Sequence, residues 1–188
     1  MLKEEVAKAL KIIQDGGIIL YPTDTIWGIG CDATNSEAVK KIFALKQRAE
    51  AKSMIILVDT ENKLQSYVRE VPDIAYDLIE YAENPLTLVM PGAKNIAPEL
   101  IAEDGSVGIR VAKHPFCEQL IQRLRKPLVS TSANISGQPS PQNFGQVAPE
   151  IIEGVDYVVD IDQHDLSVKK PSTIMRLAPD GGFEFIRR

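Results

Sequence analysis

A short apolar run at residues 127–129 is followed directly by four small polar side chains, Ser130, Thr131, Ser132 and Asn134. The run has the length of a buried strand, and we expect the strand to end where the polar residues begin. Hydroxyl and carboxamide groups packed this tightly can form the walls of a pocket for an oxygen-rich ligand. They can also bond their own backbone in a turn that Gly137 closes, and the segment by itself fits either interpretation.

A second polar group stands at the end of another apolar run. Residues 18–21 have the pattern of a buried strand that breaks at Pro22. They are followed by Thr23, Asp24, Thr25, Gly28 and Gly30. Hydroxyls, a carboxylate and glycines after a strand are typical of a ligand site. The alternative is a tight turn in which Asp24 bonds its own backbone.

Lys46 lies on the apolar side of a predicted helix, three residues after Phe43 and seven after Val39. Arg48 would point away from Lys46 in a continuing helix, so the two cations converge only if the helix ends here, which we predict. The alternative is a solvated helix end where Lys46, Arg48 and Lys52 face the helix dipole.

Arg110 belongs to a predicted strand at residues 106–112. Alternation places Arg110 on the same face as Gly108 and Ala112, whose side chains are too small to crowd it. An isolated cation on a cleared sheet face suits a bound carboxylate or phosphate. An exposed strand arginine without a ligand is the alternative.

At 188 residues the chain is long enough to bury a sizeable core, which predicts a single domain over residues 1–188. Helices are predicted in seven places: residues 2–15, a segment that begins with a capping box at 34–37, residues 60–66, a segment between Pro72 and Pro85, a short helix near Leu100, a segment around Phe116 to Leu124, and residues 147–152. The predicted strands are 18–21, 54–58, 86–90, 106–112, 127–129, 155–159, 172–177 and 183–186. We expect residues 162–170 to form a mobile loop or lid.

The composition excludes several classes of protein. A net charge of −5 argues against a general nucleic-acid binder, so contact with RNA would need a local basic patch. The two cysteines and two histidines have no zinc-site spacing and suit a reducing compartment. Acids and lysines interrupt the apolar residues of the N-terminus, which therefore has no signal or membrane-span pattern, and we expect a cytoplasmic protein.

Familiar nucleotide and hydrolase motifs are missing from the sequence: GxxxxGK[ST], GxGxxG, HExxH and GxSxG. What remains is a dispersed set of cations and hydroxyls at strand and helix ends: Thr25, Lys46, Arg48, Arg110, residues 130–134, Ser172 and Arg187. Such a set is typical of an anion pocket. It could stabilise charge on a phosphorus centre without a protein nucleophile.

Five ordered blocks of the sequence resemble those of the YrdC/Sua5 family: YPTDTIWGIGCDA (21–33), KIFALKQR (41–48), PLTLVMPG (85–92), VGIRV (107–111) and STSANISGQPSP (130–141). The resemblance implies a YrdC-like α/β fold, with a twisted, open mixed sheet, helices packed on it and a wide concave cleft. It also implies a threonylcarbamoyl-AMP synthase, which joins L-threonine, bicarbonate and ATP and releases pyrophosphate. A transferase complex would then modify adenosine 37 of tRNA.

The resemblance also implies roles for individual residues. The Lys-x-Arg signature falls on Lys46 and Arg48, the implied catalytic pair, and the Ser-x-Asn signature falls on Ser132 and Asn134. The implied ATP-binding residues are Arg48, Lys52, Ser106, Ser132, Asn134, Ser140 and Arg187. The implied threonine-binding residues are Thr25, Arg110, Ser130 and Ser172. Mg²⁺ would arrive with ATP on the pyrophosphate, without a protein metal site.

The sequence departs from the family pattern beside Arg48, where Gln47 and Ala49 replace the usual Gly and Pro. The second C-terminal domain of the longer Sua5 branch is not visible, so the chain resembles the short form. Two other functions remain open: a non-catalytic module that binds double-stranded RNA or tRNA, and carbamoyl-adenylate chemistry as in hydrogenase-maturation carbamoyltransferases.

Overall fold

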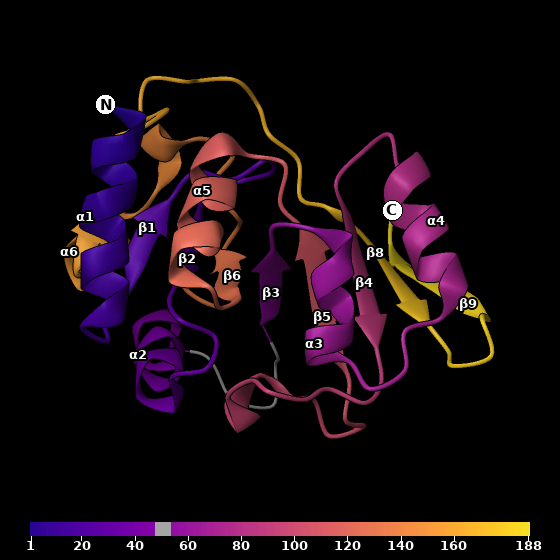
Figure 1. Cartoon of the computed structure of the whole chain (residues 1–188). Coiled ribbons are helices and arrows are strands. Elements are labelled where there is room, and N and C mark those ends of the chain that lie inside the picture. The colour runs from indigo at the N-terminus through magenta and orange to yellow at the C-terminus, as the bar shows by residue number, and fades with distance from the viewer. Residues whose placement is uncertain (48–53) are drawn as a thin grey trace.

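The computed structural model describes residues 1–47 and 54–188, and these residues form one mixed sheet of nine strands (Figure 1). The strands are β1 (Ile19–Tyr21), β2 (Gly28–Gly30), β3 (Ile55–Val58), β4 (Leu86–Met90), β5 (Val107–Val111), β6 (Leu128–Ser132), β7 (Tyr157–Val158), β8 (Thr173–Leu177) and β9 (Phe183–Arg187). Their order across the sheet is β7-β1-β2-β6-β3-β5-β4-β8-β9. The pairs β1–β7, β3–β5 and β4–β8 are parallel, and the others are antiparallel.

Helices cover both faces of this sheet. They are α1 (Leu2–Gln14), α2 (Ser36–Lys46), α3 (Leu64–Tyr67), α4 (Asp73–Tyr81), α5 (Pro115–Leu124) and α6 (Pro149–Gly154), with short 3₁₀ turns η1 (Glu61–Lys63), η2 (Pro98–Leu100) and η3 (Phe144–Gln146). Helices α1 and α5 lie side by side (Figure 1), and their apolar stripes pack on Ile19 and Tyr21 of β1. On the other face, buried residues of α2 belong to the same core cluster as Leu20 of β1. A single strand thus supplies both cores, because successive strand residues point to opposite faces.

Most predicted elements are confirmed, within one or two residues at their ends. Helix α2 ends at Lys46 as predicted, and Gln47 follows in the left-handed region with φ of 51°. Residues 162–170, the expected loop, form neither helix nor strand. Two of its backbone groups are tied to the preceding loop, since Lys169 N donates to Gln142 O and Leu166 O accepts from the Asn143 side chain.

Two predicted strand ends are wrong. Strand β6 continues through Ser132, because Ser130 pairs with Ile55 of β3, and Thr131 and Ser132 pair with β2. Residues 28–30 form strand β2 and do not belong to a turn. In both places, neighbouring strands on each side supply the hydrogen bonds that keep small, weakly strand-forming residues extended.

The predicted capping box at residues 34–37 is also wrong. Asn35 caps α2, because its side chain accepts a hydrogen bond from Ala38 N. The Thr34 hydroxyl donates instead to the carboxylate of Asp32. The capping position therefore moves one residue toward the C-terminus, where asparagine performs the same function.

Gly30 is enclosed where β1, β2 and β6 meet. A Cβ there would collide with the carbonyl oxygen of Val129 and would lie 2.7 Å from Cε1 of Tyr21. We expect Gly30→Ala to lower the free energy of unfolding by about 3 kcal/mol, as overpacking a tight core does. Chemical denaturation would measure this loss. The control is Gly145→Ala, whose Cβ would meet only the Asn143 side chain, at 3.4 Å, and an equal loss in both variants would contradict the packing argument.

Candidate functional site

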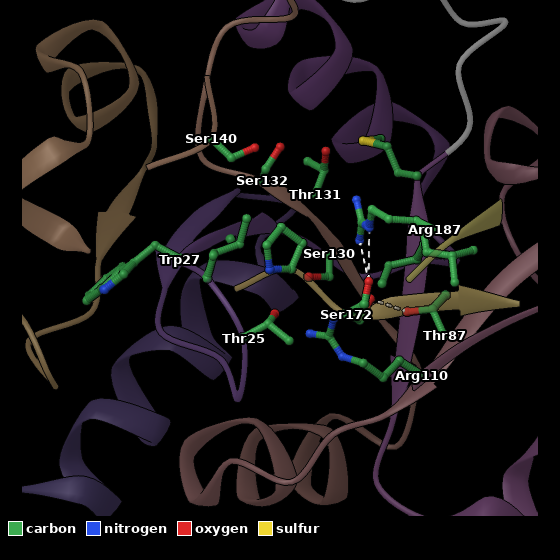
Figure 2. A pocket seen from close by; sticks show the side chains of 16 residues that line it. Thr25, Trp27, Thr87, Arg110, Ser130, Thr131, Ser132, Ser140, Ser172 and Arg187 are labelled. Carbon is green, nitrogen blue, oxygen red and sulfur yellow. Dashed lines mark hydrogen bonds between the residues drawn. The ribbon is translucent and has the colours of Figure 1, made fainter. Parts of the chain in front are cut away.

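A polar cavity of about 200 Å³ opens on the sheet (Figure 2). It is lined by Thr25, Ile26, Trp27, Gly28, Met54, Ile55, Thr87, Arg110, Ser130, Thr131, Ser132, Ser140, Pro171, Ser172, Ile174 and Arg187. Within the described residues, this lining holds two guanidinium groups and seven hydroxyl groups but no carboxylate. The cavity is therefore suited to an anionic, oxygen-rich ligand.

Strand register brings the lining residues to one face of the sheet. Arg110 pairs with Leu57 of β3 and Thr87 of β4, and Ser130 pairs with Ile55. Directly opposed residues point to the same side of a sheet. Because Leu57 packs in the core under α1 and α5, the cavity occupies the same face as these two helices.

Arg110 is the most enclosed cation of the cavity, with 4% of its side chain exposed. The alternative of an exposed strand arginine is therefore wrong. Its Nη2 lies 3.4 Å from Oδ1 of Asp24. In the described part of the chain, Nε and Nη2 of Arg110 have no hydrogen-bond acceptor. Buried donors are costly to leave unpaired, so the guanidinium is prepared for a ligand that accepts hydrogen bonds.

Arg187 approaches the same cavity from the last strand. Its Nε and Nη2 donate to the carbonyl oxygen of Ser172 at 3.0 and 2.8 Å (Figure 2). Burial lowers the pKa of Arg187, and the positive charge of Arg110 lowers it further. The hydroxyl of Ser172 is in turn 2.8 Å from that of Thr87. This network fixes the residues before β8 against β9 and β4.

Thr25 enters the cavity from a tight turn after β1. The Thr23 hydroxyl accepts a hydrogen bond from Thr25 N at 3.0 Å and donates to Ile26 O at 2.8 Å. The turn expected here is therefore present, but the Thr23 hydroxyl maintains it. The expected bonds from Asp24 to its own backbone are not made, since neither carboxylate oxygen has a hydrogen-bond partner among the described residues.

Lys46 lies beneath the loop that follows β6. Its side chain is buried, as predicted, and Nζ donates to the carbonyl oxygens of Ser132 and Asn134. Asn134 donates from its own amide to Gln138 O at 2.7 Å. Ser132 lines the cavity, whereas Lys46 and Asn134 do not. The contacts of Lys46 thus shape the wall of the cavity from behind.

The remaining predicted site residues divide into three groups. Ser140 lines the cavity, close to Ser132 and Thr131 in the view of Figure 2. Ser106 does not line it, and its hydroxyl donates to the carboxylate of Asp104. This hydrogen bond lowers the pKa of Asp104. Arg48 and Lys52 lie outside the described residues, so the predicted convergence of Arg48 with Lys46 stays a prediction.

Removing the Lys46 ammonium tests whether it supports the loop. We expect Lys46→Met to lower the free energy of unfolding by about 1–3 kcal/mol, because carbonyl oxygens of Ser132 and Asn134 lose a buried donor. Thermal denaturation would measure the change. Lys41→Met is the control, since Lys41 on the same helix also donates to a carbonyl but is exposed. A Lys46→Met variant of normal stability with no activity would indicate a direct role toward substrate.

Some lining residues are missing from the sequence-based prediction. Thr87 is the only polar residue of the strand LTLVM, and that exception in an apolar run is a signal that could have identified it. Trp27 packs its ring on Phe144 with centroids 4.8 Å apart. Its position depends on a contact between residues far apart in sequence, so no local pattern indicates it.

The described residues contain no group of three or more His, Cys, Asp or Glu side chains that could hold a metal ion. Within the same residues, none of the helices is long and apolar enough to span a membrane.

Comparisons with known proteins find chains of similar sequence and fold. The family model for Sua5, YciO and YrdC, described as telomere recombination, matches residues 11–188. The threonylcarbamoyl-AMP synthase of Pseudoalteromonas translucida is 37% identical over 158 residues, which are 82% of this chain and 84% of that protein. A putative threonylcarbamoyl-AMP synthase of Methanocaldococcus jannaschii is 35% identical over 183 residues, covering 95% of this chain and 84% of that protein.

Two solved structures share the fold. P. abyssi Sua5 complexed with L-threonine superposes with a TM-score of 0.82 at 27% identity, covering 94% of this chain and 52% of that one. This chain therefore spans about half the length of that Sua5 chain. E. coli YciO superposes with a TM-score of 0.85, covering 100% of this chain and 90% of that one, but its 22% identity supports only the fold.

Proposed function

The chain belongs to the Sua5/YciO/YrdC family, and we propose that it is a threonylcarbamoyl-AMP synthase. It would join L-threonine, bicarbonate and ATP into threonylcarbamoyl-AMP and release pyrophosphate. The observation that carries this proposal is the cavity, whose described lining combines two guanidinium groups with hydroxyls and no carboxylate. L-Threonine occupies a Sua5 protein of the same fold, and synthases are among the chain's relatives.

The lining divides into two ends, which suit two substrates. Arg110 and Thr25 lie at one end in Figure 2, whereas Ser132 and Ser140 lie at the other. At the first end, Arg110, Thr25, Ser130 and Ser172 would hold threonine, with the guanidinium on its carboxylate. At the second end, Ser132, Ser140 and Arg187 would face the nucleotide.

The reaction needs positioning and charge neutralisation more than a protein nucleophile. The amine of threonine condenses with bicarbonate to give a carbamate and water. A carbamate oxygen then attacks the α-phosphorus of ATP, and pyrophosphate leaves. Arg187 would offset negative charge on the phosphates, with Lys46, Arg48 and Lys52 proposed nearby. Mg²⁺ would accompany ATP, because phosphate oxygens are ligands that it prefers.

We extend the proposal to the partners and location of the protein. The product is a reactive mixed anhydride, so a transferase complex would have to collect it and pass the threonylcarbamoyl group to adenosine 37 of tRNA. A cytoplasmic location would give access to ATP and tRNA. Direct tRNA contact would require a local basic surface, since the whole chain has a net charge of −5.

Pyrophosphate release tests the function. With ATP, L-threonine and bicarbonate together, we expect release that stops when threonine or bicarbonate is omitted, and threonylcarbamoyl-AMP should be detected by mass spectrometry. Salt-sensitive tRNA binding without threonine-dependent release would favour a non-catalytic RNA-binding module. Release that requires carbamoyl phosphate in place of threonine and bicarbonate would favour the other carbamoyl-adenylate chemistry.

A further inference from the structure

Asp24 is a buried carboxylate for which the proposed reaction gives no role. Only 8% of its side chain is exposed. Neither of its oxygens accepts a hydrogen bond from any described residue. A buried carboxylate without hydrogen bonds is costly and requires a nearby positive charge.

The carboxylate is not needed for the turn that carries it. Hydrogen bonds of the Thr23 hydroxyl to Thr25 N and Ile26 O already close this turn. An aspartate that served the turn would bond the backbone two residues later, and Asp24 does not. The side chain must therefore be explained by something outside the turn.

The charge that faces Asp24 is Arg110. The atoms Asp24 Oδ1 and Arg110 Nη2 are 3.4 Å apart, which is longer than a hydrogen-bonded ion pair of about 2.8 Å. The carboxylate thus attracts the guanidinium, but it accepts no hydrogen bond from the guanidinium nitrogens. Arg110 also experiences the opposing charge of Arg187, whose pKa the Arg110 charge helps to lower.

We propose that Asp24 is a positioning residue whose carboxylate holds the Arg110 guanidinium in the orientation that receives the carboxylate of threonine. The proposal rests on the proposed function, because it requires an amino acid in this cavity. Two cations share the cavity and no carboxylate is among its described lining residues. The negative charge of Asp24 beside Arg110 would therefore offset the repulsion from Arg187 and keep the Arg110 guanidinium in place when the cavity is empty.

Calorimetric binding of L-threonine, which needs no turnover, is the first measurement. We expect Asp24→Asn to weaken threonine binding and to raise the KM for threonine about 10- to 100-fold, while the KM for ATP changes less than about threefold. Asp24→Glu should recover part of the threonine affinity. If Asp24 only reduced the positive electrostatic potential of the cavity, Asp24→Asn would bind threonine more tightly than the wild type. That result would overturn the proposal.

Asp32→Asn is the matched control. The Asp32 side chain is also 8% exposed, but Thr34 and Lys126 pair with its carboxylate, and it does not line the cavity. We expect it to lose stability with no change in threonine affinity. If Asp32→Asn loses as much threonine affinity as Asp24→Asn does, the positioning role of Asp24 is also overturned.

A double variant keeps the test decisive if Asp24→Asn folds poorly. Because Arg110→Met with Asp24→Asn removes both charges, it leaves no unpaired ion. If Asp24 acts through Arg110, adding Asp24→Asn to Arg110→Met should not weaken threonine binding further. Additive losses would overturn the proposal. If the wild-type protein binds no threonine, both the proposed function and the role of Asp24 are overturned. If Asp24→Asn binds threonine normally, only the role of Asp24 is overturned.

Discussion

Replacing Arg110 by methionine is expected to raise the KM for L-threonine roughly 30- to 4,000-fold. The Arg110 side chain is 96% buried, and two of its guanidinium nitrogens have no hydrogen-bond acceptor among the described residues. A desolvated cation that binds a carboxylate contributes about 2–5 kcal/mol to affinity, which corresponds to roughly 30- to 4,000-fold. Methionine keeps the length of the stem and removes the charge. The KM for ATP should change much less, because threonine is the proposed ligand of Arg110.

The stability of this variant separates binding from folding. Arg110→Met leaves Asp24 buried beside no cation, so we expect the free energy of unfolding to fall by about 3–5 kcal/mol. The Arg110→Met and Asp24→Asn double variant should recover most of that stability and none of the threonine affinity. Arg176→Met on β8 is the control, since Arg176 is exposed and pairs with Asp104 at the surface. Normal threonine affinity in the double variant would show that Arg110 does not bind the amino acid.

The sequence predicts features that depend on local periodicity. Alternation in residues 106–112 places Arg110 on one face of a strand, and helical spacing places Lys46 on the buried side of α2. Neither pattern identifies the partner of the side chain. The Lys46 ammonium contacts carbonyl oxygens 86 and 88 residues away, and Arg110 faces a carboxylate on a different segment of the chain. Such contacts are set by strand order, which local periodicity does not give.

Strand pairing also explains what the sequence misplaced. Ser130 to Ser132 have weak strand propensity, yet β2 and β3 pair with them from both sides. Ser172 and Arg187 meet because β8 and β9 are antiparallel neighbours.

Replacing Arg187 by methionine is expected to lower kcat/KM for ATP about 10- to 100-fold, since charged hydrogen bonds contribute about 1.5–3 kcal/mol each. The side chain lines the cavity and donates twice to the Ser172 carbonyl. Its loss therefore removes positive charge from the proposed nucleotide end and also frees a residue proposed to hold threonine. Initial rates measured at varied ATP and at varied threonine would separate these effects. The loss in kcat/KM should be larger for ATP than for threonine.

Arg188→Met is the matched control for Arg187→Met, because the next residue carries the same group on the exposed ring of Phe185 and does not line the cavity. Equal losses in both variants would mean that the end of β9 frays when either arginine is removed. Arg187→Lys adds a further distinction. Lysine keeps the charge but cannot reproduce the two parallel donations to Ser172 O, so it should recover ATP kinetics better than threonine kinetics. The opposite pattern would indicate that Arg187 acts on threonine through Ser172 and makes no charge contribution at the phosphates.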